Sequence, residues 1–238
     1  MTELIKLEGI VINKNDLNDS DRFLKIFTPS FGKVDVLIKG IKKSKKRDKI
    51  AADVLSYCKV VGYKKGQNFI GSSIELISSY EFIRKDIDKV GTALYMFSIL
   101  NNILNDSQQN NDLFQLVCKS LKYINEEKEK YKYITLLLFF MNKVITLEGV
   151  SYIFQDGKYF SIKESYIGKH QYVDSLLLSD EEYKVISAIK NHKIRELLKN
   201  TISIKSLFNI LKVYEKYLNY HLEINLNVKN YILEEIAW

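Results

Sequence analysis

The stretch Arg22-Phe-Leu-Lys-Ile-Phe-Thr-Pro-Ser-Phe-Gly-Lys-Val-Asp-Val-Leu-Ile-Lys39 decides the fold of the first part of the chain. Apolar and polar residues alternate on both sides of its centre, the period of strands with one buried face. Pro29 and Gly32 stand where a tight turn favours proline and glycine. The stretch therefore predicts a hairpin with strands at 22–28 and 33–39. If Leu24 and Ile26 face inward, Phe23, Lys25 and Phe27 share the outer face.

Three further segments have the composition of strands, namely 4–12, 54–63 and 69–79. Five short strands joined by hairpins and one long loop suit a small OB-type barrel, although an SH3-like barrel would give the same pattern. We therefore predict an OB-type barrel domain over residues 1–80.

From about Tyr80 onward apolar residues recur every three or four positions, which predicts amphipathic helices. We expect them at 90–104, 113–121, 134–147 (ending near Gly149), 176–189, 204–222 and 228–236. Residues 81–238 then form a helical domain with an irregular or hairpin insert at about 150–169, where Asp156-Gly157 between aromatic residues predicts a hairpin. The fold class is α+β, a five-stranded OB-type barrel followed by an all-helical domain.

Positive charge is concentrated directly after the predicted hairpin. Residues 39–49 hold seven basic residues and one acidic residue, whereas the whole chain of 238 residues has a net charge of +7. Such a local excess favours a polyanionic ligand, the alternative being an ordinary solvated loop in a lysine-rich chain. Together with outward aromatic residues on neighbouring strands, it is typical of proteins that bind single-stranded nucleic acid, so we predict that the barrel domain over residues 1–80 binds nucleic acid.

The sequence offers no pattern for catalysis. Its glycines form neither a dinucleotide fingerprint nor a phosphate loop, no serine lies in a nucleophile elbow, and three histidines are scattered. Cys58 and Cys118 are too few for a four-cysteine zinc site and are expected to be small buried residues. We expect no enzymatic activity, cofactor, metal or small-molecule substrate. With neither an export signal nor an apolar membrane span, we expect a cytoplasmic protein.

Several motifs together resemble the RecO family. The strongest are Glu8-Gly-Ile-Val-Ile12, Asp21-Arg22-Phe-Leu-Lys-Ile-Phe-Thr28-Pro29, Phe31-Gly32-Lys33, and Lys39-Gly40 before the basic segment. Weaker matches continue through the helices, at Leu113-Phe-Gln-Leu116, at 139–149 and at Tyr217-Leu-Asn-Tyr-His221-Leu222.

The resemblance implies a recombination mediator of DNA repair that binds single- and double-stranded DNA, anneals complementary strands and acts with RecR and SSB at the nucleoid. The residues expected to contact DNA are Arg22, Lys33, Lys39, Lys42, Lys43, Lys45, Lys46, Arg47 and Lys49.

The sequence departs from the family pattern in two places. Many members carry a four-cysteine zinc cluster after the glycine that corresponds to Gly149, but residues 150–169 contain no cysteine. We expect Tyr152, Phe154, Tyr159 and Phe160 to fill that space. The family's Tyr-x-x-Glu-Leu is similar to Tyr95-Met-Phe-Ser98-Ile99, with serine replacing the acid.

A second hypothesis is a non-catalytic interaction scaffold whose helical domain is the working surface and whose basic segment is incidental. Lys205, Lys212 and Lys216 fall on one face of a predicted helix and could bind the acidic, apolar-ended C-terminal tail of SSB. A solvated helix face is the simpler alternative for these lysines.

Overall fold

The computed structural model describes residues 4–65, 68–106 and 108–232 of the chain. The chain divides into two compact units, Met1–Asn125 and Glu126–Trp238. Each unit is described by itself below.

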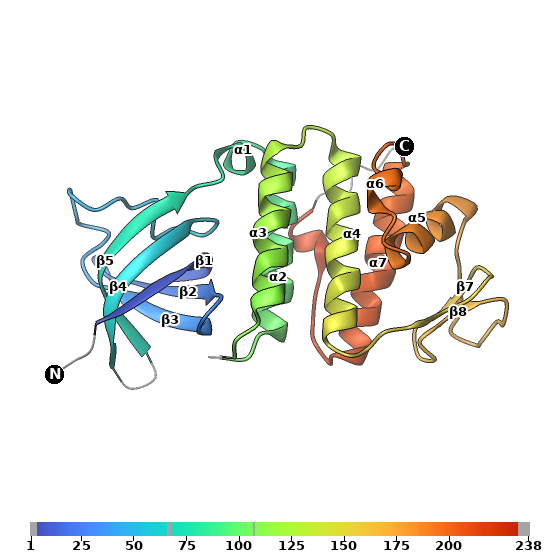
Figure 1. Ribbon diagram of the computed structural model, residues 1–238, viewed down its shortest axis with the longest axis horizontal. Coiled ribbons are helices and arrows are strands. Elements are labelled where there is room, and N and C mark those ends of the chain that lie inside the picture. Colours follow the sequence, from blue (N-terminus) through green and yellow to red (C-terminus); the bar gives the residue numbers. More distant parts are fainter. Residues whose placement is uncertain (1–3, 66–67, 107, 233–238) are drawn as a thin grey trace. The chain divides into compact units, whose positions relative to one another are not determined.

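The first unit begins with a closed five-stranded barrel (Figure 1). Its strands are β1 (Ile5–Asp16), β2 (Arg22–Thr28), β3 (Gly32–Ile38), β4 (Tyr57–Lys65) and β5 (Asn68–Ser78). They are ordered β1-β2-β3-β5-β4, and β1 also pairs with β4 to close the barrel. This is an OB-type arrangement, with β5 parallel to β3 and all other pairs antiparallel. The predicted α+β class and OB-type barrel are confirmed.

The barrel core comes from the alternation seen in the sequence. Leu24 pairs with Val36 and Ile26 with Val34 across β2 and β3, and all four side chains are buried. The chain after β3 also contributes Ile41, Ala51 and Ala52 to the same core. The condition set from the sequence is therefore met, because the aliphatic face lies inside. The segment that holds the basic residues is fastened to the barrel at both ends.

After the barrel, the described residues of the first unit form the helices α1 (Glu81–Arg84), α2 (Ile87–Ile103) and α3 (Asn111–Glu126). The Asp86 carboxylate accepts hydrogen bonds from the N–H groups of Asp88 and Lys89, which fixes the start of α2. Phe114 of α3 packs edge-on against Phe27 of β2, with ring centres 5.4 Å apart. Phe27 is consequently buried, so its predicted place on an exposed Phe/Lys face was wrong.

The second unit contains α4 (Lys130–Leu147), α5 (Asp180–Lys190), α6 (Ile194–Leu197), α7 (Ile204–His221) and the 3-10 helix η1 (Val228–Asn230). The predictions of α4 and α7 are confirmed. The helix expected from residue 176 starts later, because Ser179 and Glu182 form a reciprocal capping box before α5. The helix expected at 228–236 is a 3-10 turn at 228–230, and its residues 233–236 lie outside the described part of the chain.

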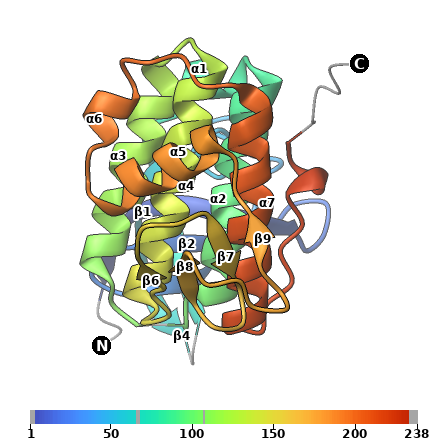
Figure 2. The ribbon, with the colours of Figure 1, turned by 90° about the vertical axis from the view of Figure 1, so that its right-hand side faces the viewer.

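A small four-stranded sheet interrupts the helices of the second unit (Figure 2). Its strands are β6 (Ile153–Phe154), β7 (Tyr159–Ser161), β8 (Tyr166–Gly168) and β9 (Leu176–Leu177), in the order β6-β8-β7-β9. The hairpin expected around Gly157 was wrong, because β8 lies between β6 and β7. Within the predicted insert the antiparallel hairpin is instead formed by β7 and β8. A Cβ atom at Gly157 would lie 2.2 Å from the Lys169 nitrogen, so glycine serves a close backbone approach there.

Tyrosine side chains connect this sheet to the helices around it. The Tyr152 hydroxyl donates to Asn142 Oδ1 on α4 and lies 2.9 Å from the Tyr214 hydroxyl on α7. Phe160 lies 5.2 Å from Tyr152, ring centre to ring centre, as the aromatic cluster predicted from sequence requires. Phe154 instead stacks on Tyr183 of α5. The described residues include no group of three or more histidine, cysteine or acidic side chains placed to hold a metal ion.

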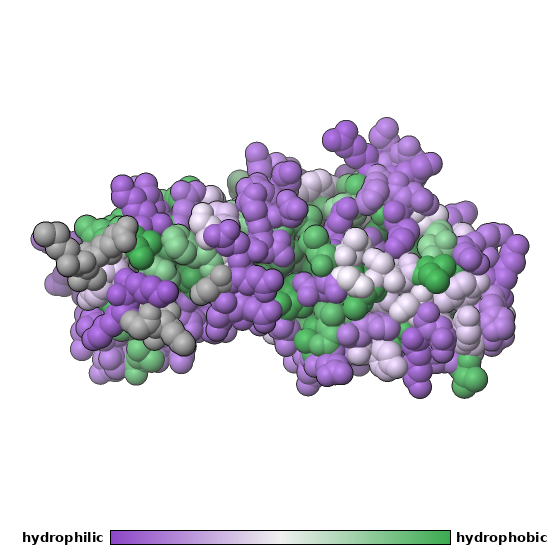
Figure 3. All heavy atoms as spheres, turned by 60° about the horizontal axis from the view of Figure 1, so that its bottom comes forward, coloured by the Kyte–Doolittle hydropathy of each residue, from purple (hydrophilic) through white to green (hydrophobic). Residues whose placement is uncertain are grey.

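No helix among the described residues is long and apolar enough to cross a membrane. Hydrophilic residues cover most of the face shown in Figure 3, with smaller hydrophobic areas between them. Both cysteines are buried or partly buried, and this burial raises the pKa of Cys58 to about 12 and that of Cys118 to about 11. Neither thiol is therefore poised to react.

Candidate nucleic-acid interface

The basic loop, residues 39–49, leaves the end of β3 and is held against the β1–β2 turn. The Gly40 N–H donates to Asp21 Oδ1 at 2.7 Å, and the Lys42 N–H donates to the Ser20 carbonyl at 3.0 Å. The Gly40 hydrogen bond holds the pKa of Asp21 below its ordinary value, so the carboxylate stays charged at neutral pH. Gly40 itself has a φ of 65°, which favours glycine. The loop is thus anchored rather than merely solvated.

Hydrogen bonds within the basic loop also fix its shape. Ser44 Oγ accepts from the N–H groups of Lys46 and Arg47, and Arg47 Nη1 donates to the Lys39 carbonyl at 2.9 Å. These bonds close a turn at 44–47 and join it to the start of the loop. The exposed lysines of the loop are Lys39, Lys43, Lys45, Lys46 and Lys49.

Arg22 and Lys42 meet at Asp16, at the end of β1. Arg22 Nε lies 2.7 Å from Asp16 Oδ1, and Lys42 Nζ lies 3.2 Å from Asp16 Oδ2. The Arg22 hydrogen bond is the main cause that lowers the pKa of Asp16 to about 2. Arg22 also donates to the Ala52 carbonyl at 3.0 Å. Both cations therefore tie the loop to the barrel.

A hollow of about 240 Å³ lies beside this cluster. Arg22, Ile41, Lys42 and Lys49 line it, so three cationic side chains converge on it. Asp16 neutralises only part of this charge. A phosphate group is the kind of anion that such a surface attracts.

Lys33 is not part of this group. It lies at the opposite end of β3, where its Nζ approaches the Asn101 carbonyl at 3.3 Å and Asp106 Oδ1 at 3.6 Å. Only 12% of its side chain is exposed. The structure thus brings eight of the nine predicted residues together and directs Lys33 toward the end of α2.

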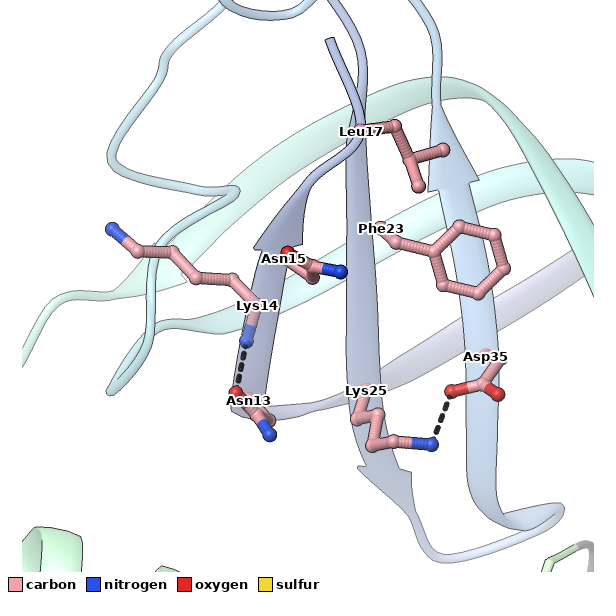
Figure 4. A pocket seen from close by; sticks show the side chains of 7 residues that line it. All are labelled: Asn13, Lys14, Asn15, Leu17, Phe23, Lys25 and Asp35. Carbon is pink, nitrogen blue, oxygen red and sulfur yellow. Dashed lines mark hydrogen bonds and ion pairs between the residues drawn. The ribbon is translucent and has the colours of Figure 1, made fainter.

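The outer face of β1, β2 and β3 carries a second hollow, of about 330 Å³, next to the β1–β2 turn (Figure 4). Its lining residues are Asn13, Lys14, Asn15, Leu17, Phe23, Lys25 and Asp35. Phe23 and Lys25 were expected on this face. Asn13, Lys14 and Asn15 were missed, because β1 was predicted to end at Ile12 and in fact continues to Asp16 beside β2.

The three lysines considered for a tail peptide, Lys205, Lys212 and Lys216, all lie on α7. Lys205 and Lys216 are exposed, while Lys212 is partly buried. Leu207, Leu211 and Leu218 form part of the buried side of the same helix. The helical arrangement is thus as predicted, and peptide binding there stays a prediction.

The barrel with its anchored basic loop, followed by helices, defines a two-part α+β protein with an OB-type domain. Two family models match consecutive parts of this chain, Recombination protein O N terminal over residues 1–80 and Recombination protein O C terminal over residues 84–230. The chain therefore belongs to the RecO family of DNA repair proteins.

Individual relatives agree with this assignment. The chain is 24% identical over 241 residues to the DNA repair protein RecO of Acetivibrio thermocellus, with 96% of each chain covered. It is 22% identical to that of Exiguobacterium sp., covering 95% of this chain and 94% of the relative. The protein of Thermoanaerobacter sp. is 32% identical over 124 residues, which cover 52% of this chain and 50% of the relative.

Proposed function

We propose that this chain is a DNA-binding recombination mediator. It binds single- and double-stranded DNA, anneals complementary strands, and helps to load recombinase together with RecR and SSB at the nucleoid in the cytoplasm. The observation that carries the proposal is the basic loop, which presents five exposed lysines from a frame anchored in the barrel. Contacts of this kind go to phosphates and do not choose a base sequence.

Annealing follows from the same charge. Two complementary strands repel each other through their phosphates, and lysines that neutralise phosphates release counterions and lower that repulsion. The free energy of DNA binding therefore drives annealing, and no nucleotide hydrolysis is required. Arg22 and Lys42 support the loop through Asp16 and line the hollow of about 240 Å³ beside it, where we expect a phosphate group to bind. Lys33 has a structural role.

The test is the salt dependence of affinity for a single-stranded oligonucleotide. If about six phosphates are contacted, log affinity falls against log salt with a slope of about −4, at about −0.7 per contact. Replacing Lys43, Lys45, Lys46 and Lys49 by glutamine reduces the slope by about 3. These four are chosen because they are exposed and do not hold the loop.

The matched control replaces Lys6, Lys59, Lys64 and Lys122, which are exposed elsewhere in the same unit. It makes the same change in net charge but should leave the slope close to that of the unmodified protein. An unchanged slope for the loop variant, or an equally reduced slope for the control variant, would show that the basic loop is not the surface that contacts DNA.

For partner recognition, we propose that Lys205, Lys212 and Lys216 on α7 receive the acidic tail of SSB. Glutamine at Lys205 and Lys216, the two exposed positions, should weaken binding of a labelled tail peptide at least fivefold while DNA affinity stays unchanged. If the peptide binds and DNA does not, the interaction scaffold becomes the better description of the chain.

A further inference from the structure

We infer that the hollow around Phe23 binds one unpaired nucleobase and so lets the barrel distinguish single-stranded from double-stranded DNA. This inference rests on the proposed function, because it assigns a ligand to the surface beside the basic loop. The Phe23 hollow is the one lined by Asn13, Lys14, Asn15, Leu17, Phe23, Lys25 and Asp35 (Figure 4).

Phe23 supplies the stacking surface. It lies in β2 between Asn15 of β1 and Leu37 of β3, and its ring is partly exposed whereas Leu24 beside it is fully buried. The barrel core therefore does not require this ring. An aromatic ring presented from an OB-type strand can stack on the flat face of any base.

Amide groups lie where the edge of a stacked base would come. Within the described chain, the Asn15 side chain has no hydrogen-bond partner, and Asn13 uses only its Oδ1, which accepts from the Lys14 N–H at 2.8 Å. An amide both donates and accepts, and the edges of bases present both kinds of group. The hollow can thus bond a base without selecting a sequence.

The charges of the hollow are already paired. Lys25 Nζ lies 2.9 Å from Asp35 Oδ1, and Lys14 Nζ lies 2.6 Å from Asp53 Oδ1. Both lysines therefore have a carboxylate partner, whereas among the described residues no carboxylate forms an ion pair with Lys43, Lys45, Lys46 or Lys49 of the basic loop. A neutral planar group suits the Phe23 hollow better than a phosphate does.

The hollow and the basic loop adjoin each other through the β1–β2 turn. Leu17 lines the hollow, and the next residue, Asn18, accepts a hydrogen bond from Lys42 Nζ at 2.9 Å. A strand whose phosphates lie on the loop can therefore place a base in the hollow. A duplex keeps its bases paired and stacked, and extracting one costs energy, so a duplex uses the loop alone.

The experiment measures the affinity of the full chain for fluorescein-labelled oligo-dT of 20 nucleotides and for a 20-base-pair duplex. Phe23→Ala should weaken binding of oligo-dT about tenfold, the loss of one stacked base, and leave duplex affinity within about twofold. Phe23→Tyr retains the ring and should bind like the unmodified protein. Phe23→Leu keeps an apolar side chain and the fold, but should bind as weakly as Phe23→Ala.

A second probe identifies the base as the group that binds. An abasic oligonucleotide of the same length should bind the unmodified protein and Phe23→Ala with equal affinity, because it has no base to stack on the ring. Phe82→Ala removes another aromatic ring from the same unit, 60% exposed on α1, and should change neither affinity.

The outcomes separate the two proposals. If the unmodified protein binds neither oligo-dT nor duplex, the proposed function fails and the inference fails with it. If it binds both, and Phe23→Ala weakens both equally or neither, the Phe23 hollow is not a base site while the basic loop remains the DNA interface. Full affinity of Phe23→Leu would likewise overturn the stacking role.

Discussion

The barrel of the first unit and the small sheet of the second unit are both made of β-strands, but different forces hold them. The barrel has five strands of 7 to 12 residues around a core that is almost entirely aliphatic. The small sheet has strands of two or three residues and depends on rings and hydroxyl groups. A closed barrel buries enough apolar surface to leave its outer face free for charge. A short sheet needs directed bonds to its helices.

Those directed bonds lie where the family resemblance would have placed a zinc cluster. Tyr152 bonds to Asn142 and Tyr214, and Tyr217 donates to the Val150 carbonyl at 2.7 Å while its hydroxyl lies 2.8 Å from the Ser165 hydroxyl. Burial raises the pKa of Tyr152 and Tyr214, so both hydroxyls stay protonated and available as donors. In this chain, tyrosine hydroxyls rather than cysteines connect the sheet to α4 and α7.

The largest expected effect is the loss of the ring at the centre of the small sheet. Phe160 is fully buried and lies 5.2 Å from Tyr152 and 5.8 Å from Tyr217, ring centre to ring centre. Phe160→Ala should lower the free energy of unfolding by about 3–5 kcal/mol, since a cavity replaces the ring. Urea unfolding measures this change. A loss below about 1 kcal/mol would show that the sheet does not depend on its aromatic core.

Removing the Tyr152 hydroxyl tests how much the hydrogen bonds of the tyrosines contribute to the stability of the small sheet. Tyr152→Phe removes the donor to Asn142 Oδ1, and Asn142 is buried. Because a buried acceptor loses its partner, we expect a loss of about 1–3 kcal/mol in the free energy of unfolding. An unchanged midpoint in urea would mean that the hydroxyl bonds contribute nothing to the sheet.

The matched change in the barrel removes one carbon atom. Ile26→Val leaves no polar group without a partner, because Ile26 is surrounded by aliphatic core residues. We expect a loss of about 0.5–1.5 kcal/mol, smaller than that of Tyr152→Phe. Urea unfolding measures both variants. A larger loss in the free energy of unfolding for Ile26→Val than for Tyr152→Phe would mean that the barrel core, and not the small sheet, is the more sensitive region.

The smallest expected effect concerns pH and the anchoring of the basic loop. Because the pKa of Asp16 is lowered to about 2, its ion pairs stabilise the fold above the unfolded pKa of about 4, and this stability disappears as pH falls from about 4 to about 2. Asp16→Asn should therefore lower Tm slightly at pH 6 and by less at pH 2. An equal difference in Tm at both pH values would argue against Asp16 as the anchor.

The sequence predicted those parts of the fold that follow from periodicity. Alternation located β2 and β3, and the spacing of three and four located α4 and α7. Strands of two or three residues are too short for a period, so the small sheet was read as a hairpin and the start of a helix. The burial of Phe27 depends on Phe114, 87 positions away, and no local pattern indicates that contact.

The candidate site was predictable to a similar extent. The run of charge from 39 to 49 indicated the basic loop directly, but charge alone did not show that Ile41 fastens it to the core. Lys33 was grouped with the other lysines expected to contact DNA, because all of them have the same side chain. Its position at the far end of β3 instead directs it to the end of α2. Asn13 and Asn15 join the site because β1 and β2 extend side by side.

The most direct test of the central claim is the rate at which two complementary 40-nucleotide strands anneal at low salt. The account predicts that the unmodified protein accelerates annealing, and that glutamine at Lys43, Lys45, Lys46 and Lys49 lowers this acceleration at least tenfold. Glutamine at Lys205 and Lys216 should leave it unchanged, because those lysines belong to the second unit. Full acceleration by the loop variant would contradict the account.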